Sequence, residues 1–461
     1  MADTMKETPM YKAYVATTTT LPLGTLLMIV ATACTTTRSA VPAVSGAAPP
    51  AVNTSTPCCD RGAFSAGLRI AERYRNPAIT ERRFTHQRFW SAVDASVKAA
   101  TLKVETLGQS VLGRDIRSVT FGSGAARVLL WSQMHGDEAT ATMALADIFG
   151  FLADTVRSDL RDRLTRELTI VFVPMLNPDG AELFQRQNAM GIDVNRDARR
   201  LVTPEARALK SVHERFKPHF GFNLHDQSAR TRAGSRGPAS AIALLPPAYD
   251  EAKSYNDLRR RARLVAATLA TMFAYEIPGR VAKYDDTYEP RAFGDLMQQW
   301  GTSTVLIESG AMPNDPEKQR LRALNVAAIL AVLDAIATGA YERAEISAYE
   351  SLPFNAGGAS DLLLRNAQLV LPGKPPMRVD IAINYEDALA KADGRVRDVG
   401  DLDAVIAIDT VDLSGLFLHP SPRALTTTPA GPMLRIGAPA VFEVRRGESP
   451  SSELVRRIGS N

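Results

Sequence analysis

Residues 126–138 read ARVLLWSQMHGDE, and this stretch decides the fold. Its first half, residues 126–131, is a mostly apolar run that favours a buried strand. Residues 139–152 follow with apolar side chains at helical spacing. A strand that leads through a short polar loop into a helix is the building unit of α/β sheets.

The same alternation extends on both sides of this stretch, from about residue 84 to 340. Further strands are expected at residues 168–173, 220–224 and 304–307, and a helix at residues 321–336. We therefore predict an α/β fold with a mixed, largely parallel sheet that is flanked by helices.

The last part of the chain changes character. Turn-rich segments there separate short β-type runs at residues 361–370, 378–383, 404–408 and 440–444. This pattern predicts a smaller all-β accessory domain of about 100 residues.

The beginning of the chain resembles an export signal. Residues 21–33 are apolar but shorter than the roughly 20 residues that span a bilayer. The run ends in Val-Ala-Thr-Ala-Cys, which resembles a bacterial lipobox and predicts lipidation of Cys34. We expect a membrane-anchored lipoprotein of the cell envelope that faces the periplasm or the exterior. The alternative is a secreted protein with a disordered leader.

Composition completes this division of the chain. Residues 35–60 are rich in Thr, Ser, Pro and Ala and predict a disordered tether after the signal peptide of residues 1–34. A catalytic domain at residues 61–345 and the accessory domain at residues 346–461 follow. The formal charge of +4 is small and scattered, which excludes the electrostatic footprint of a nucleic-acid-binding protein.

His135 and Glu138 are the first candidate metal ligands. They lie three residues apart at the expected start of a helix, where such a pair faces the same way. The pair offers an imidazole nitrogen and a carboxylate oxygen to one ion. A catalytic zinc site needs three protein ligands and one open position, so a third ligand is required.

The third ligand is expected to be His225. The chain has six histidines, and His225 directly follows the strand predicted at residues 220–224. Ligands of α/β sheets bind at the carboxyl ends of strands, so this position would place it beside His135. We interpret His213 and His219 as surface residues.

Further motifs accompany these histidines in a fixed order. They are Asn177-Pro178-Asp179-Gly180, Arg186, the GIDVNRD run at residues 191–197, His225, and Leu306-Ile307-Glu308-Ser309-Gly310. The series resembles the zinc carboxypeptidase (funnelin) family, in its bacterial branch, over roughly residues 85–340. The resemblance implies that family's fold and one Zn²⁺ ion per chain.

The resemblance also implies roles for individual residues. The implied zinc ligands are His135, Glu138 and His225. Glu308 matches the general base that takes a proton from metal-activated water, and Arg186 matches the arginine that stabilises the oxyanion. The residues implied to bind the substrate are Asn195, Arg196 and Tyr288. We interpret Asp193 and Asp197 as structural.

Two departures from the family pattern leave alternatives open. Asp137 stands where digestive carboxypeptidases carry Arg, and this filling is more similar to murein peptide amidases and to the desuccinylase and aspartoacylase branch. Tyr284 competes with Tyr288 for the position of the family's mobile tyrosine.

The sequence thus predicts a zinc-dependent metallopeptidase of the cell envelope. Its expected partners are a membrane, through Cys34, and a peptide substrate cleaved near a free carboxylate, with cell-wall peptides among the candidates. One alternative is a zinc-dependent deacylase or amidase of amino-acid conjugates or murein peptides. The other is a non-catalytic peptide-binding lipoprotein.

Overall fold

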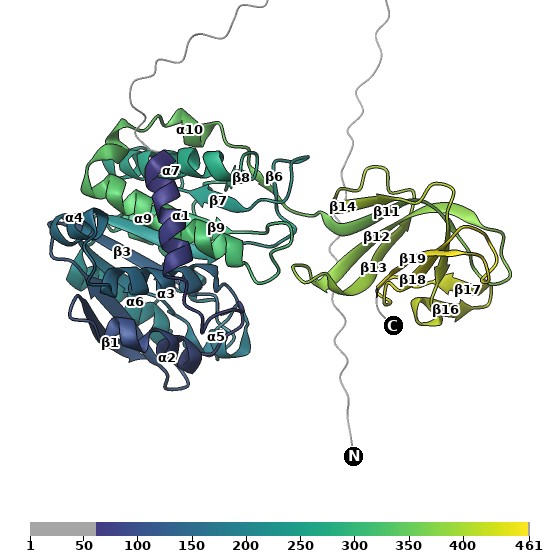
Figure 1. Ribbon diagram of the computed structural model, residues 1–461, viewed down its shortest axis with the longest axis horizontal. Coiled ribbons are helices and arrows are strands. Elements are labelled where there is room, and N and C mark those ends of the chain that lie inside the picture. Colours follow the sequence, from purple (N-terminus) through teal and green to yellow (C-terminus); the bar gives the residue numbers. More distant parts are fainter. Residues whose placement is uncertain (1–60, 460–461) are drawn as a thin grey trace, which may run out of the picture. The chain divides into compact units, whose positions relative to one another are not determined.

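The computed structural model describes residues 61–459 (Figure 1). The signal peptide and tether predicted at residues 1–34 and 35–60 lie outside this range, so both stay predictions. The described residues belong to one compact unit. No helix within the described range combines the length and the apolar character needed to cross a membrane.

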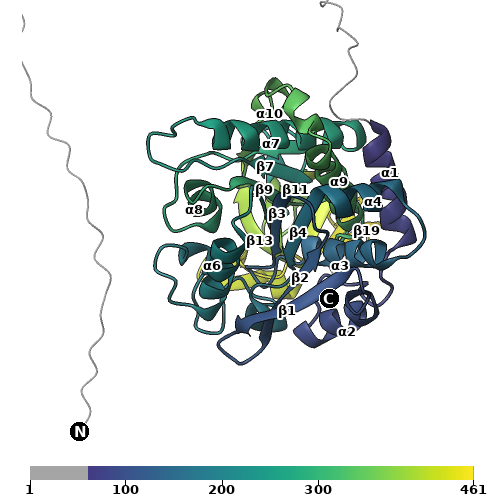
Figure 2. The same cartoon turned by 90° about the vertical axis from the view of Figure 1, so that its left-hand side faces the viewer.

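An eight-stranded mixed sheet forms the centre of the α/β part (Figure 2). Its strand order is β1-β2-β4-β3-β5-β9-β7-β8. The strands are β1 (Leu102–Gln109), β2 (Asp115–Phe121), β3 (Ala126–Ser132), β4 (Leu168–Val173), β5 (Phe220–Asp226), β7 (Ile242–Leu245), β8 (Val281–Lys283) and β9 (Ser303–Ser309). Strands β4, β3, β5 and β9 run parallel at the centre, and antiparallel pairs join them to β2 and β7. The predicted mixed α/β fold is confirmed.

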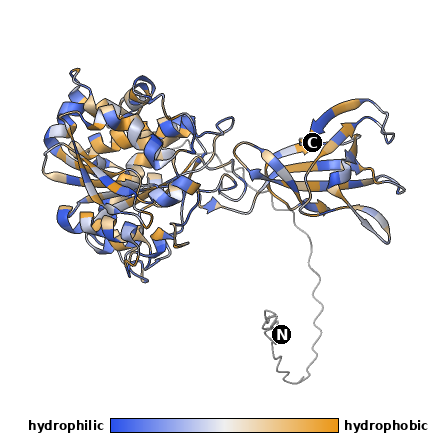
Figure 3. Cartoon of the chain, turned by 90° about the horizontal axis from the view of Figure 1, so that it is seen from below, coloured by the Kyte–Doolittle hydropathy of each residue, from blue (hydrophilic) through white to orange (hydrophobic). Residues whose placement is uncertain are grey.

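Helices cover both faces of this sheet. They are α1 (Arg61–Arg73), α2 (His86–Val97), α3 (Thr140–Ala153), α4 (Asp159–Glu167), α5 (Pro178–Leu183), α6 (Pro204–Phe216), α7 (Asp257–Glu276), α8 (Phe293–Gln299), α9 (Gln319–Ala337) and α10 (Ser347–Glu350). Their alternating blue and orange bands in Figure 3 fit helices with one apolar face.

Strand β3 shows how one sequence builds both cores. Successive side chains of a strand point to opposite faces of a sheet. Val128 and Leu130 therefore pack in the core under α3, α7 and α9. Leu129 and Trp131 pack on the other face, against α6 and α8. All four side chains are fully buried, which explains the continuous apolar run.

The C-terminal part contains a separate sheet with the order β13-β12-β11-β15-β18-β19, in which β14 also pairs with β11. Its elements are β10 (Asn355–Ala356), β11 (Ser360–Leu369), β12 (Met377–Asp387), β13 (Ala392–Gly400), β14 (Ala407–Asp412), β15 (Phe417–Pro420), β16 (Leu425–Thr428), β17 (Gly431–Leu434), β18 (Phe442–Arg445) and β19 (Leu454–Ile458). The C-terminal part has an apolar core of its own, which includes Leu364, Ile381, Leu418 and Val444.

One expected strand begins three residues later than predicted. Residues 404–408 were expected to be extended, but β14 starts at Ala407. The backbone N–H of Val405 donates to the carbonyl of Leu402, and the N–H of Asp403 donates to the Asp401 carboxylate. These turn hydrogen bonds take the place of strand pairing.

Candidate metal centre and active site

The candidate site lies where three neighbouring parallel strands end. Strand β5 pairs with β3 on one side and with β9 on the other. In the second pairing, His225 lies directly opposite Glu308. His135 follows the end of β3 by three residues. The sheet therefore brings two predicted ligands and the predicted base to one edge, as parallel strands do.

The loop after β3 holds His135 and Glu138 in a turn rather than in a helix. The N–H of Glu138 donates to the carbonyl of His135 at 3.1 Å, and α3 begins only at Thr140. Gly136 packs directly on the backbone of Gly180, since a Cβ there would lie 1.9 Å from the Gly180 carbonyl carbon. Only glycine fits this approach, so the loop depends on both glycines.

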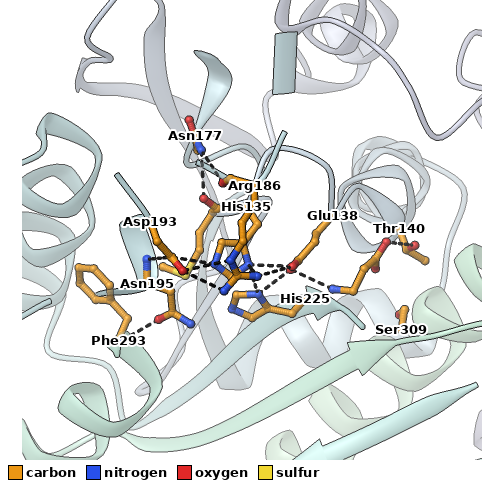
Figure 4. A network of polar contacts seen from close by, with 12 residues as sticks. His135, Glu138, Thr140, Asn177, Arg186, Asp193, Asn195, His225, Phe293 and Ser309 are labelled. Carbon is orange, nitrogen blue, oxygen red and sulfur yellow. Dashed lines mark hydrogen bonds and ion pairs between the residues drawn. The ribbon is translucent and has the colours of Figure 1, made fainter. Parts of the chain in front are cut away.

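The three predicted ligands converge on a single point (Figure 4). Nδ1 of His135 lies 2.8 Å from Oε1 of Glu138, and Nδ1 of His225 lies 2.7 Å from Oε2. The two Nδ1 atoms are 3.1 Å apart. All three residues are at most 8% exposed. Two imidazoles and one carboxylate, buried and aimed at one point, fit the ligand set of a catalytic zinc.

The electrostatics of these side chains fit the same interpretation. Burial acts to lower the pKa of His135, but Glu138 and Asp193 raise it to about 9. Burial acts to raise the pKa of Glu138, but both imidazoles hold it well below its usual range. The site is therefore arranged around a negative charge that a bound cation would neutralise.

Asp193 supports the site from behind. Its Oδ1 lies 3.0 Å from Nε2 of His135 and accepts a hydrogen bond from the N–H of Asn195. Its other oxygen accepts from Arg186 at 3.0 Å. A carboxylate on the far nitrogen of a metal-binding imidazole fixes its orientation and tautomer. Asp193, interpreted as structural from the sequence, thus belongs to the site, and only its place two residues before Asn195 hinted at this.

Arg186 contacts two of the predicted ligands, His135 and Glu138. Its Nη1 is 3.2 Å from Nδ1 of His135 and 3.3 Å from Oε1 of Glu138. Its side chain is 40% exposed, so the guanidinium faces both the ligands and the solvent. Asp193 binds two nitrogens of this guanidinium. The positively charged group is thereby held where it can stabilise a negative charge that develops in the reaction.

Glu308 faces the same cavity, which measures about 340 Å³ and also contains all three ligands. Its Oε2 is buried and has no hydrogen-bond partner among the described residues. Burial and the neighbouring Glu138 raise its pKa well above the usual range. A carboxyl group so placed is ready to exchange a proton.

Asn195 and Arg196 also line this cavity. They belong to a short 3₁₀ helix, η1 (Val194–Arg196). The N–H of Phe293 donates to the Asn195 side-chain oxygen at 2.9 Å, so the amide oxygen is used inside the protein. Arg196 donates to the Asn195 carbonyl and lies 3.4 Å from Glu289.

The structure distinguishes the two candidate tyrosines by position. Tyr284 lines the cavity, whereas Tyr288 is not among its described lining residues. Burial and Glu308 raise the pKa of the Tyr284 phenol, so it stays protonated and able to donate a hydrogen bond. The spacing in the sequence could not separate the two tyrosines. They lie four residues apart, shortly before Pro290, and only the fold decides which of them lines the cavity.

His213, expected at the surface, is buried. Its Nε2 lies 3.0 Å from the hydroxyl of Thr302, and burial lowers its pKa to about 4. His219 is half-buried, and its Nδ1 accepts from the N–H of Arg127. Helix α6 turns His213 toward the sheet, which its charged sequence neighbours concealed. Neither histidine joins the metal centre.

Comparison with known proteins gives the same assignment. The model of the zinc carboxypeptidase family matches residues 90–243. Carboxypeptidase 2 of Trichophyton tonsurans is 31% identical over 131 residues, which are 28% of this chain and 23% of that protein. A probable carboxypeptidase 2 of Arthroderma benhamiae is 31% identical over 110 residues, or 24% of this chain and 20% of that one. The chain thus spans under a quarter of the length of these curated relatives.

A solved metallo-carboxypeptidase from Burkholderia cenocepacia is 18% identical, with a TM-score of 0.46 over 56% of this chain and 70% of that chain. The family match covers β3, the turn with His135 and Glu138, Arg186, η1 and His225. Residues 90–243, which hold this part of the site, therefore match the zinc carboxypeptidase family.

Proposed function

We propose that the chain is a zinc-dependent metallopeptidase that hydrolyses a peptide bond near a free carboxylate and holds one zinc ion per chain. The observation that carries the proposal is the register of β5 and β9. It places the third ligand, His225, directly opposite Glu308, so the metal site and an unpartnered carboxyl group share one cavity.

His135, Glu138 and His225 would hold the zinc. Bound zinc supplies a Lewis acid that lowers the pKa of water to about 7 and polarises a carbonyl. Glu308 accepts the proton of the attacking water and returns it to the leaving amine.

Arg186 and the pair Asn195 and Arg196 would position the substrate. The Arg186 guanidinium stabilises the oxyanion more strongly than the ground-state carbonyl. Arg196 and the Asn195 amide donate to the terminal carboxylate, which matches the planar fork of an arginine. Tyr284 would donate a hydrogen bond from its phenol to the substrate in the same cavity. We therefore assign to Tyr284 the substrate contact first expected of Tyr288.

A deacylase or amidase is the second candidate. Asp137 is the observation that favours this candidate. Its half-buried carboxylate lies beside the predicted ligands, at the position where digestive carboxypeptidases have a cation. A purely binding function is a weaker candidate, since ligand binding does not require the unpartnered base Glu308.

We also place the protein in the cell envelope, anchored through Cys34 or secreted. The apolar run at residues 21–33 and its ending in cysteine support this placement. Radiolabelled palmitate incorporation in a bacterial host tests the anchor. Label in the parent and none in Cys34→Ser is the expected result, and equal label in both contradicts it.

Glu308→Gln tests the chemical step. Loss of the proton acceptor should lower kcat by about 10²–10⁴-fold on an N-blocked dipeptide, while zinc content stays at the parent level. Glu251→Gln, an exposed change outside the cavity, is the matched control. A Glu308→Gln enzyme that works at the parent rate would remove Glu308 from the mechanism.

The same dipeptide with its carboxyl group amidated tests the carboxylate requirement. The amide should react about tenfold more slowly or worse, because Arg196 then meets no carboxylate on the substrate. Equal rates for the acid and the amide would favour the amidase candidate.

A further inference from the structure

A second cavity continues from the metal site. It measures about 380 Å³ and shares Glu138, Arg186 and Asp226 with the first cavity. Its far wall comes from the C-terminal β region, through residues Glu386, Asp387, Ala388 and Leu389. Asn195 and Arg196 line only the first cavity, so the second leads away from them.

The wall is the connection between β12 and β13. Asp387 pairs with Ala392 at the end of this hairpin, so residues 388–391 form its four-residue loop. Ala388 and Leu389, which lie in this loop, present apolar side chains to the cavity.

Specific contacts fix the hairpin beside the catalytic residues. Arg82 forms an ion pair with Asp387, and Arg83 lies 3.8 Å from the same carboxylate. Arg230, five residues after the ligand His225, donates to both oxygens of Asp361 at 2.9 and 2.8 Å. Such a bidentate pair sets orientation as well as distance.

Asp361 also binds the base of the hairpin. It is 5% exposed and accepts the N–H of Tyr385 at 2.6 Å, two residues before Asp387. The loop after β5 and the base of the hairpin are thereby joined through a buried carboxylate, and Arg230 also donates to the carbonyl of Tyr385 at 2.5 Å.

We propose that the β12–β13 loop is a specificity wall that limits how many residues a substrate carries on the acyl side of the cleaved bond. The inference rests on the proposed function. When a terminal carboxylate is bound at Asn195 and Arg196 and the cleaved bond lies at the ligands, the rest of the peptide enters the second cavity. Both cavities lie at the small end of the roughly 300–1,000 Å³ range of ligand sites. Short peptides fit, and longer ones meet Ala388 and Leu389.

Two variants with opposite effects test the wall. Ala388→Trp adds bulk at the loop, and replacement of residues 388–391 by Asn-Gly shortens it with a turn that suits hairpins. Ala430→Trp in the exposed β16–β17 turn is the matched control. The substrates are blocked peptides with one or with four residues before the cleaved bond.

Ala388→Trp should lower kcat/KM for the long peptide by about tenfold or more and change the short one less than about twofold. The shortened loop should raise kcat/KM for the long peptide by a similar factor. Equal changes for both peptides, or no change in either variant, would overturn the inference.

A labelling experiment separates this inference from the proposed chemistry. In zinc-loaded Leu389→Cys/Glu308→Gln, the alkylation rate of the new cysteine is followed by peptide mass spectrometry, which distinguishes it from Cys34, Cys58 and Cys59. A five-residue peptide with a free carboxylate should slow this alkylation at least about threefold, and a dipeptide should not. Absence of protection overturns the wall. If the peptide protects the cysteine but the parent protein hydrolyses no peptide, only the proposed function is refuted.

Discussion

Lys318→Met is the most informative structural perturbation, because Lys318 joins the two strand ends that carry His225 and Glu308. Its Nζ lies 3.0 Å from Oδ2 of Asp226, the residue after His225. It also donates to the carbonyl of Ser309, the residue after Glu308, at 3.1 Å. Burial raises the pKa of Asp226 against the effect of Lys318, so this carboxylate depends on its partner.

The expected magnitude follows from burial. The side chains of Lys318 and Asp226 are 5% and 8% exposed. Removing one partner from such a pair leaves a buried charge and costs about 3–5 kcal/mol. Lys98 and Asp94 form an i,i+4 pair with side chains 73% and 54% exposed, so Lys98→Met should cost only about 0.3–0.5 kcal/mol.

Urea unfolding followed by tryptophan fluorescence measures both losses. Methionine keeps the length of the side chain and the same backbone requirement at φ 52°, so the comparison isolates the charge. Lys318→Met/Asp226→Asn should recover most of the loss, because no charge then remains buried. A Lys318→Met loss below about 1 kcal/mol would refute the structural reasoning.

Three further predictions concern the site and its surroundings. Asp193→Asn should weaken zinc binding by about 10–100-fold in chelator competition, because His135 loses its orienting carboxylate; unchanged affinity would exclude this role. When zinc is added to protein stripped of metal, the zinc affinity should rise with pH up to about 9, since zinc must displace the proton of His135. An affinity that does not change between pH 7 and 9 would contradict this. His213 has a folded pKa of about 4 against 6.5 when unfolded, so its stabilising contribution is complete above pH 6.5 and lost as pH falls toward 4. That loss, up to about 3 kcal/mol, should be absent in His213→Gln when urea midpoints are compared across this range.

The sequence was sufficient to predict the centre of the fold and the three residues that converge at the candidate metal site. The apolar run at residues 126–131 favoured a buried strand, and His135 and Glu138 follow it directly in the sequence. His225 could be found because parallel strands end at one edge of a sheet. These features depend on local pattern and on a general rule of sheet topology.

What the sequence did not predict depends on contacts between distant segments. Asp193 meets His135 across 58 residues, and His213 meets Thr302 across 89. Arg230 and Asp361 are 131 residues apart, so no local pattern connects the metal site with the C-terminal β region. Tyr284 and Tyr288 both fit the spacing of the motif, and only the folded path of the loop after β8 separates them.

Zinc content tests the central claim most directly. Elemental analysis of the purified chain should find about one zinc per molecule in the parent and in His219→Ala, because His219 lies outside the site. His225→Ala should retain almost none, since two ligands rarely hold a catalytic zinc. A parent chain that takes up no zinc, or full occupancy in His225→Ala, would contradict the metal centre and the mechanism built on it.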